Sequence, residues 1–155
     1  MSGTIDARIA ELGLVLPTAA APIAAYRPVV VAGGIAHVSG QLPFRDGDLV
    51  TGRAGESDDV ANAAEAARLC GLMIVAQLRA ALGDLDRVEQ VIKLNVFVNS
   101  AHDFHDQPKV ANGASELMQA VFGDAGIHAR AAVGVAALPL GALVEVDAQV
   151  AVRAA

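Results

Sequence analysis

The sequence contains little that could form a disulfide framework, a nucleic-acid surface or a metal centre. Its 155 residues include one cysteine (Cys70), no tryptophan, one tyrosine and four phenylalanines. A lone cysteine excludes an intramolecular disulfide and any multi-cysteine metal site. The 11 basic residues are outnumbered by 17 acidic ones, which gives a net charge of −6. Without a basic cluster or aromatic stacking residues, nucleic acid is not an expected partner.

The chain also lacks an uninterrupted apolar run of about 18 residues, the length that a bilayer span needs. The longest uncharged runs, 12–26 and 28–44, are broken by proline, glycine, histidine and serine. The first 13 residues contain Asp6, Arg8 and Glu11, which are atypical of the apolar segment of a signal peptide. We therefore expect a cytoplasmic protein that does not enter a membrane.

What the chain does have is the composition of one well-packed domain over residues 1–155, with 54% hydrophobic residues. Helical spacing of apolar residues after Thr4 predicts an N-terminal helical extension over about 4–13, as an addition to this domain. The glycine pair at 33–34 predicts a hairpin between strands at 28–32 and 35–39. Further along, the pattern predicts a brief strand at 49–51, helices at 57–82 and 108–122, and strands at 88–99, 128–135 and 142–152.

Two helices following strands can cover only one face of such a sheet, so the fold class is α+β with two layers. In strand 88–99, alternation predicts that Ile92, Leu94, Val96 and Val98 point toward the helices. The uncovered face is either solvated or part of an interface or site. It is expected to carry Lys93, Asn95, Phe97, Arg130, Glu145 and Asp147.

Candidate chemistry concentrates on Arg130 and Glu145. No glycine-rich phosphate loop is present, and the histidines at 102 and 105, with their neighbouring aspartates, are more typical of a polar loop than of a metal site. The planar fork of an arginine can hold a carboxylate bidentately, and a nearby glutamate can take a proton from water. From the residues alone, a structural salt bridge between the two is the favoured interpretation, and a site with this chemistry is the alternative.

Residues 128–148, with an Ala-Arg pair, an apolar strand, Leu-Pro and then Val-Glu-Val-Asp-Ala, resemble the signature of the RidA family, also called YjgF or L-PSP endoribonuclease. The segment Val38-Ser-Gly-Gln-Leu-Pro43 and the strand 91–98 are similar to further parts of that family, and Tyr26 stands where the family has a site tyrosine. The resemblance covers roughly residues 20 to 153.

The resemblance implies a chorismate-mutase-like fold with a mixed sheet, a homotrimer with sites between subunits, and hydrolysis of reactive enamines and imines to 2-keto acids and ammonia without a cofactor or metal. It implies that Arg130 holds the substrate carboxylate and that Glu145 positions or activates the attacking water. It also assigns pocket residues: Tyr26, Ser39, Gly40, Asn112 and Ala132.

The chain departs from the family pattern at three places. The family often has Cys or Ser where Ala132 stands, about four extra residues precede the second long helix, and the N-terminal helix is additional. These departures are typical of a longer branch of the family, whose substrates can differ. Two alternatives stay open: a trimer that binds a small carboxylate, or acts like a chaperone, without turnover; and an endoribonuclease or translation inhibitor.

Overall fold

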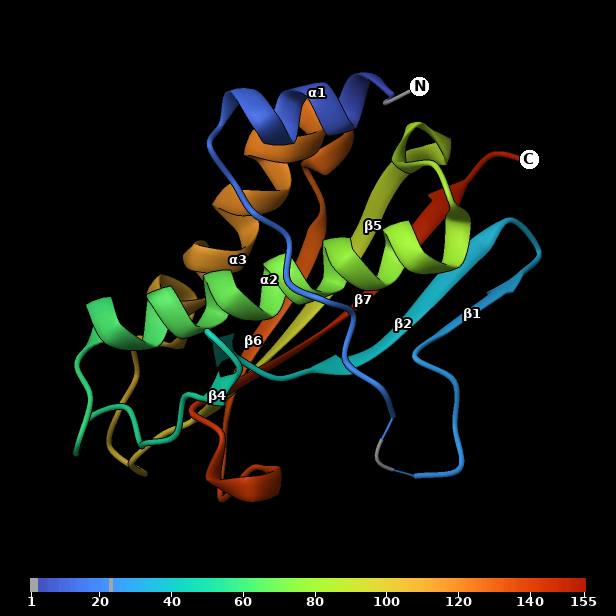
Figure 1. Cartoon of the computed structure of the whole chain (residues 1–155). Helices are drawn as coiled ribbons and strands as arrows, with labels where there is room; N and C mark the ends of the chain where they lie inside the picture. The colour runs from blue at the N-terminus through green and yellow to red at the C-terminus, as the bar shows by residue number, and fades with distance from the viewer. Residues whose placement is uncertain (1–2, 23) are drawn as a thin grey trace.

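The computed structural model describes residues 3–22 and 24–155, which form one five-stranded sheet, a short hairpin and a layer of helices (Figure 1). The helices are α1 (Thr4–Glu11), α2 (Val60–Leu82) and α3 (Gln107–Phe122), with short 3₁₀ turns η1 (Leu85–Arg87), η2 (Gly123–Gly126) and η3 (Pro139–Gly141). The strands of the main sheet are β1 (Val29–Ala32), β2 (Ile35–Gln41), β5 (Val88–Asn99), β6 (Ala129–Val135) and β7 (Val144–Val152). The hairpin consists of β3 (Phe44–Arg45) and β4 (Asp48–Leu49).

The main sheet has the strand order β1-β2-β7-β5-β6. Its neighbouring strands pair antiparallel except β5 and β6, which are parallel. Both α2 and α3 lie on the same face of this sheet, and α1 packs beside α3 (Figure 1). The predicted α+β class, with a mixed sheet and two long helices on one face, is therefore confirmed, and β6 is an edge strand.

Local sequence signals explain where the elements turn and end. Gly33 and Gly34 have φ values of 59° and 77°, the left-handed conformations that a two-residue hairpin turn requires. The Asp59 side chain accepts the Asn62 backbone N–H at 2.8 Å and caps α2. Gly83, with φ 79°, ends the same helix. These signals fix the length of α2, which spans the sheet.

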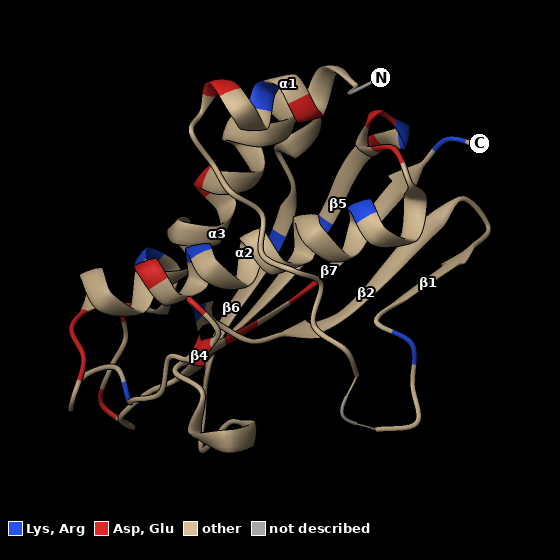
Figure 2. Ribbon diagram, viewed as in Figure 1, with Lys and Arg blue, Asp and Glu red and all other residues tan. Residues whose placement is uncertain are grey.

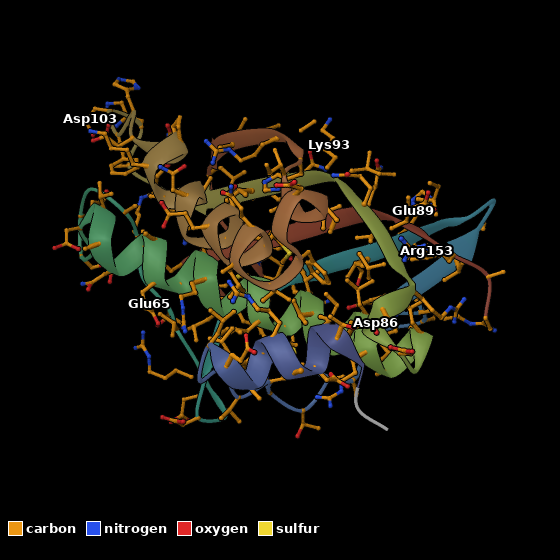
Figure 3. The ribbon with its side chains drawn as sticks, turned by 90° about the horizontal axis from the view of Figure 1, so that it is seen from above. Glu65, Asp86, Glu89, Lys93, Asp103 and Arg153 are labelled. Carbon is orange, nitrogen blue, oxygen red and sulfur yellow. The ribbon has the colours of Figure 1, made fainter. Side chains whose placement is uncertain are left out.

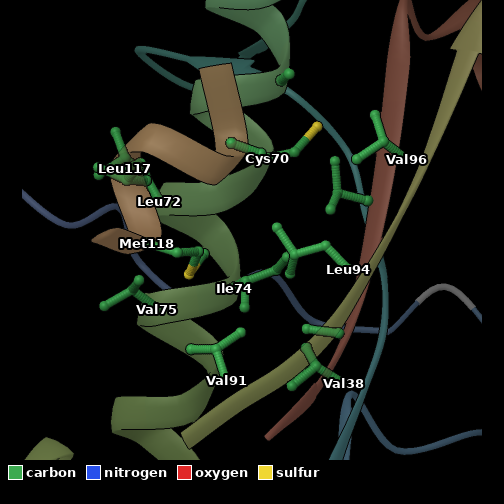
Figure 4. Close-up of a cluster of buried hydrophobic side chains, with 14 of the residues drawn as sticks. Val38, Cys70, Leu72, Ile74, Val75, Val91, Leu94, Val96, Leu117 and Met118 are labelled. Atoms are coloured by element: carbon green, nitrogen blue, oxygen red, sulfur yellow. The ribbon is translucent and has the colours of Figure 1, made fainter. Parts of the chain in front are cut away.

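The core lies between the sheet and the helices and is purely apolar at its centre. Figure 4 shows Ile74 of α2 pointing toward Leu94 of β5, while Leu117 and Met118 of α3 lie on the opposite side of α2. At Gly113, a side chain would collide with the Ala64 carbonyl, so α2 and α3 pack at close range there. Within the described part of the chain, no helix combines the length and the apolar character needed to cross a bilayer.

The N-terminal helix is held by a carboxylate from the turn before β5. Asp86 accepts the backbone N–H groups of Thr4 and Ile5, each at 2.8 Å, and Figure 3 shows it beside the first turn of α1. These two hydrogen bonds, the one to Ile5 first, lower the pKa of the Asp86 carboxyl. The predicted extension therefore exists as a helix and docks on the domain.

Two details of the sequence prediction were wrong. Ile92 does not point into the core with Leu94, because the pairing of β5 with β7 shifts between Val91 and Lys93, and Val91 takes the buried position. The brief strand lies at Asp48–Leu49 rather than 49–51, and Thr51 makes an isolated bridge to Ala142. Alternation alone does not reveal such a shift in register.

Candidate active site

The side chains of Arg130 and Glu145 lie on opposite faces of the sheet, contrary to the prediction of a shared face. In the parallel pairing of β5 and β6, Arg130 is level with the buried Leu94, so its side chain points to the helix side. Glu145 of β7 is level with Phe97, on the open face. Because side chains alternate along a strand, the predicted Arg130–Glu145 salt bridge is excluded within one copy.

Arg130 is half-buried and held by α3. Its Nη1 donates to Asn112 Oδ1 at 2.9 Å and to Ser115 Oγ at 3.2 Å, and its Nη2 donates to the Pro108 carbonyl at 3.3 Å. Guanidinium has five N–H donors. Within the described part of the chain, the Nε–H and a second Nη2–H have no acceptor, so two adjacent donors are left for a carboxylate.

Glu145 is the acidic residue of a mostly apolar pocket of about 490 Å³. Tyr26, Ser39 and Gly40 line the same pocket. Figure 2 shows acidic residues on β7 in the middle of the sheet, and Figure 3 shows Lys93 on the side of the sheet away from α2. The Glu145 carboxyl is packed so closely on Gly40 that a Cβ there would lie 2.8 Å from it.

The pKa of the Glu145 carboxyl is raised, first because burial disfavours its charged form and second because Asp147 is negative and lies two positions along the same strand face. Asn95 Nδ2 donates to Asp147 Oδ1 at 2.7 Å and holds that neighbour in place. A raised pKa makes this carboxyl a stronger base when it is ionised, which suits a group that takes a proton from water and returns it.

Sequence reasoning missed the polar residues beneath this pocket. Gln77 of α2 donates to the Ala20 carbonyl at 2.8 Å and to Gln41 Oε1 at 3.3 Å. Gln41 in turn donates to the Ser39 carbonyl at 3.0 Å and to its hydroxyl at 3.2 Å. This network ties the segment before β1 to the pocket floor. One signal was available: Gln77 is the only polar residue in the buried run 70–78.

Gly40→Ala is a prediction that tests the packing of Glu145. The backbone of Gly40 does not have a positive φ, and the nearest atoms belong to a flexible side chain, so the fold should tolerate the methyl group. The carboxyl must move, and displacement of a catalytic group by about 1 Å can cost about a hundredfold in rate. We expect unchanged thermal unfolding and a large loss of any Glu145-dependent activity. A variant as active as wild type would contradict the prediction.

The remaining predicted site residues divide between the two locations. Asn112 joins Arg130 in a second pocket, of about 320 Å³, which shares no lining residue with the Glu145 pocket. Ala132 lies in neither pocket; it faces the helix side, level with Val96, and packs against the core. One copy of the chain therefore carries two separate halves of the predicted site.

Two further candidate chemistries are a metal centre and the thiol of Cys70. Within residues 3–22 and 24–155, no three His, Cys, Asp or Glu side chains are grouped so that they could hold a metal ion. Cys70 is fully buried on α2, and burial, with a smaller contribution from Glu145, raises the pKa of its thiol well above the ordinary value. A buried thiol of this kind is a poor nucleophile.

Comparison with known proteins gives consistent matches over nearly the whole chain. The family described as "YjgF/chorismate mutase-like, putative endoribonuclease" matches residues 6–150. "Protein TCP17" of Trypanosoma cruzi is 56% identical over 151 residues, 96% of this chain and 94% of that protein. A 2-iminobutanoate/2-iminopropanoate deaminase of Dermatophagoides farinae is 30% identical over 139 residues, 88% of this chain and 93% of the relative. The crystal structure of Atu1372, a protein of unknown function from Agrobacterium tumefaciens, superposes with a TM-score of 0.89 at 49% identity, covering 96% of this chain and 93% of that one.

Proposed function

Because the chain belongs to the YjgF/chorismate-mutase-like family, we propose that it is a deaminase that hydrolyses reactive 2-imino acids, and their enamine tautomers, to 2-keto acids and ammonia. The named activity of the Dermatophagoides farinae relative supports this reaction class. No cofactor or metal enters the proposed reaction. The reaction needs a group that binds the substrate carboxylate and a group that activates water. In our proposal Arg130 is the first and Glu145 is the second.

Arg130 holds the substrate carboxylate in this proposal. Its Nε–H and remaining Nη2–H form a pair suited to two carboxylate oxygens. Hydrogen bonds to Asn112, Ser115 and the Pro108 carbonyl fix the plane of the guanidinium, so little side-chain entropy is lost on binding. Asn112 thus orients Arg130 and shapes the pocket around it.

Glu145 activates the water. Its carboxylate takes a proton from the water as the oxygen adds to C2 of the imine and the C=N π electrons move to nitrogen, and the protonated Glu145 then passes that proton to the nitrogen. In the resulting carbinolamine, the Glu145 carboxylate takes the hydroxyl proton and delivers it to the amino nitrogen, so the C–N bond breaks as the C=O bond forms, and ammonia and the 2-keto acid leave. This general acid–base work contributes about a hundredfold to ten-thousandfold. Ser39, Gly40 and Tyr26 wall the space around the reacting carbon.

The complete site then needs two copies of the chain, and we place it between neighbouring subunits of a homotrimer. Arg130 lies on the edge strand β6, where a neighbouring copy can approach, and Glu145 lies on a sheet face that no described helix covers. That face and its edge expose Val30 and Val133, 47% and 46% accessible, and carry the small residues Ala129 and Ala131. Exposed apolar surface with small residues is typical of a face that another chain covers.

The single observation that carries the proposal is the Glu145 carboxyl, half-buried with a raised pKa in an apolar pocket. The test is the rate of keto-acid and ammonia formation from 2-aminoacrylate and 2-iminobutanoate, generated in situ by a dehydratase. We expect the wild-type protein to exceed the buffer rate and Arg130→Ala to lose this acceleration. A wild-type rate equal to that of buffer would refute the imine-hydrolase function.

The pH profile gives a second prediction. The working form of Glu145 is the carboxylate. We therefore expect kcat to rise as the pH passes the pKa that Glu145 has in the enzyme–substrate complex. In that complex the substrate carboxylate offsets the positive charge of Arg130. Asp147→Asn removes the second cause of the raised pKa, while its amide oxygen can still accept from Asn95. The acid limb of kcat should therefore move to lower pH in Asp147→Asn. If the acid limb of kcat lies at the same pH in wild type and Asp147→Asn, after subtraction of the uncatalysed rate, then Asp147 does not contribute to the raised pKa of Glu145.

The alternatives differ in what they demand of the same residues. A carboxylate-binding protein without turnover would need Arg130 but not Glu145. An endoribonuclease would need clustered cations to displace the counterions of RNA, whereas the chain has a net charge of −6 and an acidic residue at the pocket. The family description includes the word endoribonuclease, but the residues of this chain favour a small carboxylic acid.

A further inference from the structure

We propose that Ser115 and His128 act as positioning residues, by forming a hydrogen-bonded relay that aims the Arg130 guanidinium at the substrate carboxylate. His128 precedes the start of β6, and Ser115 lies one turn after Asn112 on α3. The inference rests on the proposed role of Arg130 as carboxylate holder.

The direction of each hydrogen bond in the relay follows from its acceptors. The Nδ1 of His128 lies 2.6 Å from the Gly126 carbonyl, which can only accept, so Nδ1 carries the proton. In the neutral ring, Nε2 is then an acceptor, and it lies 2.9 Å from Ser115 Oγ, whose hydroxyl donates to it. A hydroxyl that donates to Nε2 keeps its lone pairs free, and one of them accepts Arg130 Nη1 at 3.2 Å.

The relay connects the Arg130 guanidinium to a rigid part of the backbone, the carbonyl of Gly126. Gly126 is buried in η2, against the backbone of Met118, where no side chain would fit. The guanidinium is therefore connected, through two side chains, to a backbone carbonyl fixed by the packing of η2 on α3. Asn112 is exposed and cannot supply the same rigidity by itself. Without the relay, only the exposed Asn112 amide and the Pro108 carbonyl hold the guanidinium, so the two donors left for the carboxylate are aimed less firmly.

The experiment compares Ser115→Val with Ser115→Thr, which have nearly the same shape and differ in the hydroxyl. His128→Ala is compared with His105→Ala, at an exposed histidine in the loop before α3. With 2-iminobutanoate as substrate, Ser115→Val and His128→Ala should raise KM about tenfold and leave kcat within about twofold, as expected when one hydrogen bond to a charged group is lost. Ser115→Thr and His105→Ala should match wild type.

A second readout does not depend on turnover: the rate at which phenylglyoxal modifies Arg130, followed by mass spectrometry with exposed Arg27 as internal reference. Loss of the relay frees the guanidinium, so Ser115→Val and His128→Ala should raise the rate at Arg130 at least about threefold. Equal rates in Ser115→Val and Ser115→Thr would overturn the relay. If the wild type hydrolyses no imine, the proposed function fails, and the phenylglyoxal comparison alone decides the relay.

Discussion

Glu145→Gln should lower kcat for 2-iminobutanoate by at least about a hundredfold, the smaller end of what a general acid–base group contributes. The amide is nearly isosteric with the carboxyl and preserves its packing on Gly40, but it cannot take a proton from water. The measurement is keto-acid formation at saturating substrate. This variant separates an enzyme from a carboxylate-binding protein, because only an enzyme requires the proton transfer.

Two controls accompany Glu145→Gln. Its affinity for pyruvate, measured by calorimetry, should stay within about threefold of wild type, because Arg130 is untouched. Its stability should not fall: the pKa of Glu145 is raised in the folded chain, so ionisation of this group costs stability as the pH rises through that pKa, and glutamine removes the cost. Undiminished kcat in a well-folded Glu145→Gln protein would remove Glu145 from the mechanism.

Co-expression of Arg130→Ala and Glu145→Gln chains, each inactive alone, should restore about a quarter of the wild-type activity. In randomly mixed trimers, a site is intact when its Arg130 comes from a Glu145→Gln chain and its Glu145 from an Arg130→Ala chain, each with a chance of about one half. The opposite sheet faces of the two side chains are the reason for this expectation. Different affinity tags on the two chains allow the mixed trimers to be purified, and in each of these about one site of three should be intact.

The matched control is the Arg130→Ala/Glu145→Gln double variant, co-expressed with wild type. This co-expression places both substitutions on one chain, so a site stays active only where both contributing chains are wild type. Its activity shows whether a mutant chain also inactivates intact sites in the same trimer. No recovery in purified mixed trimers of the single variants would mean that Arg130 and Glu145 do not share a site between copies.

Much of the fold could be predicted from the sequence, because local signals determine it. The glycine pair at 33–34, the cap at Asp59 and the helix end at Gly83 each act within a few residues. The face of Arg130 could not be predicted in this way. The face depends on whether Arg130 lies level with Leu94 or with a residue next to Leu94. The register between β5 and β6 decides this, and these strands are separated in the sequence by the whole of α3.

The residues that the resemblance named gather at pockets in most cases, but the sequence did not reveal that they divide between two faces of the sheet. Tyr26, Ser39, Gly40 and Glu145 do gather in one pocket, and Asn112 does bond to Arg130. The resemblance to a family supplied these positions. It could not supply Ser115 or His128, because a serine on a helix and a histidine before a strand acquire meaning only when α3 and β6 pack together.

The two pockets draw their walls from different stretches of the chain. Residues of 20–22, 24–28, 39–44 and 139–140 surround Glu145, with Gln77 beneath them, whereas residues of 112–119 and 126–130 surround Arg130. Substitutions around Glu145 can therefore reshape the space for a substrate's side chain while its carboxylate holder stays intact. For the proposed reaction, this separation means that substitutions in the loops around Glu145 would change which 2-imino acids fit without changing the residues that bind their common carboxylate.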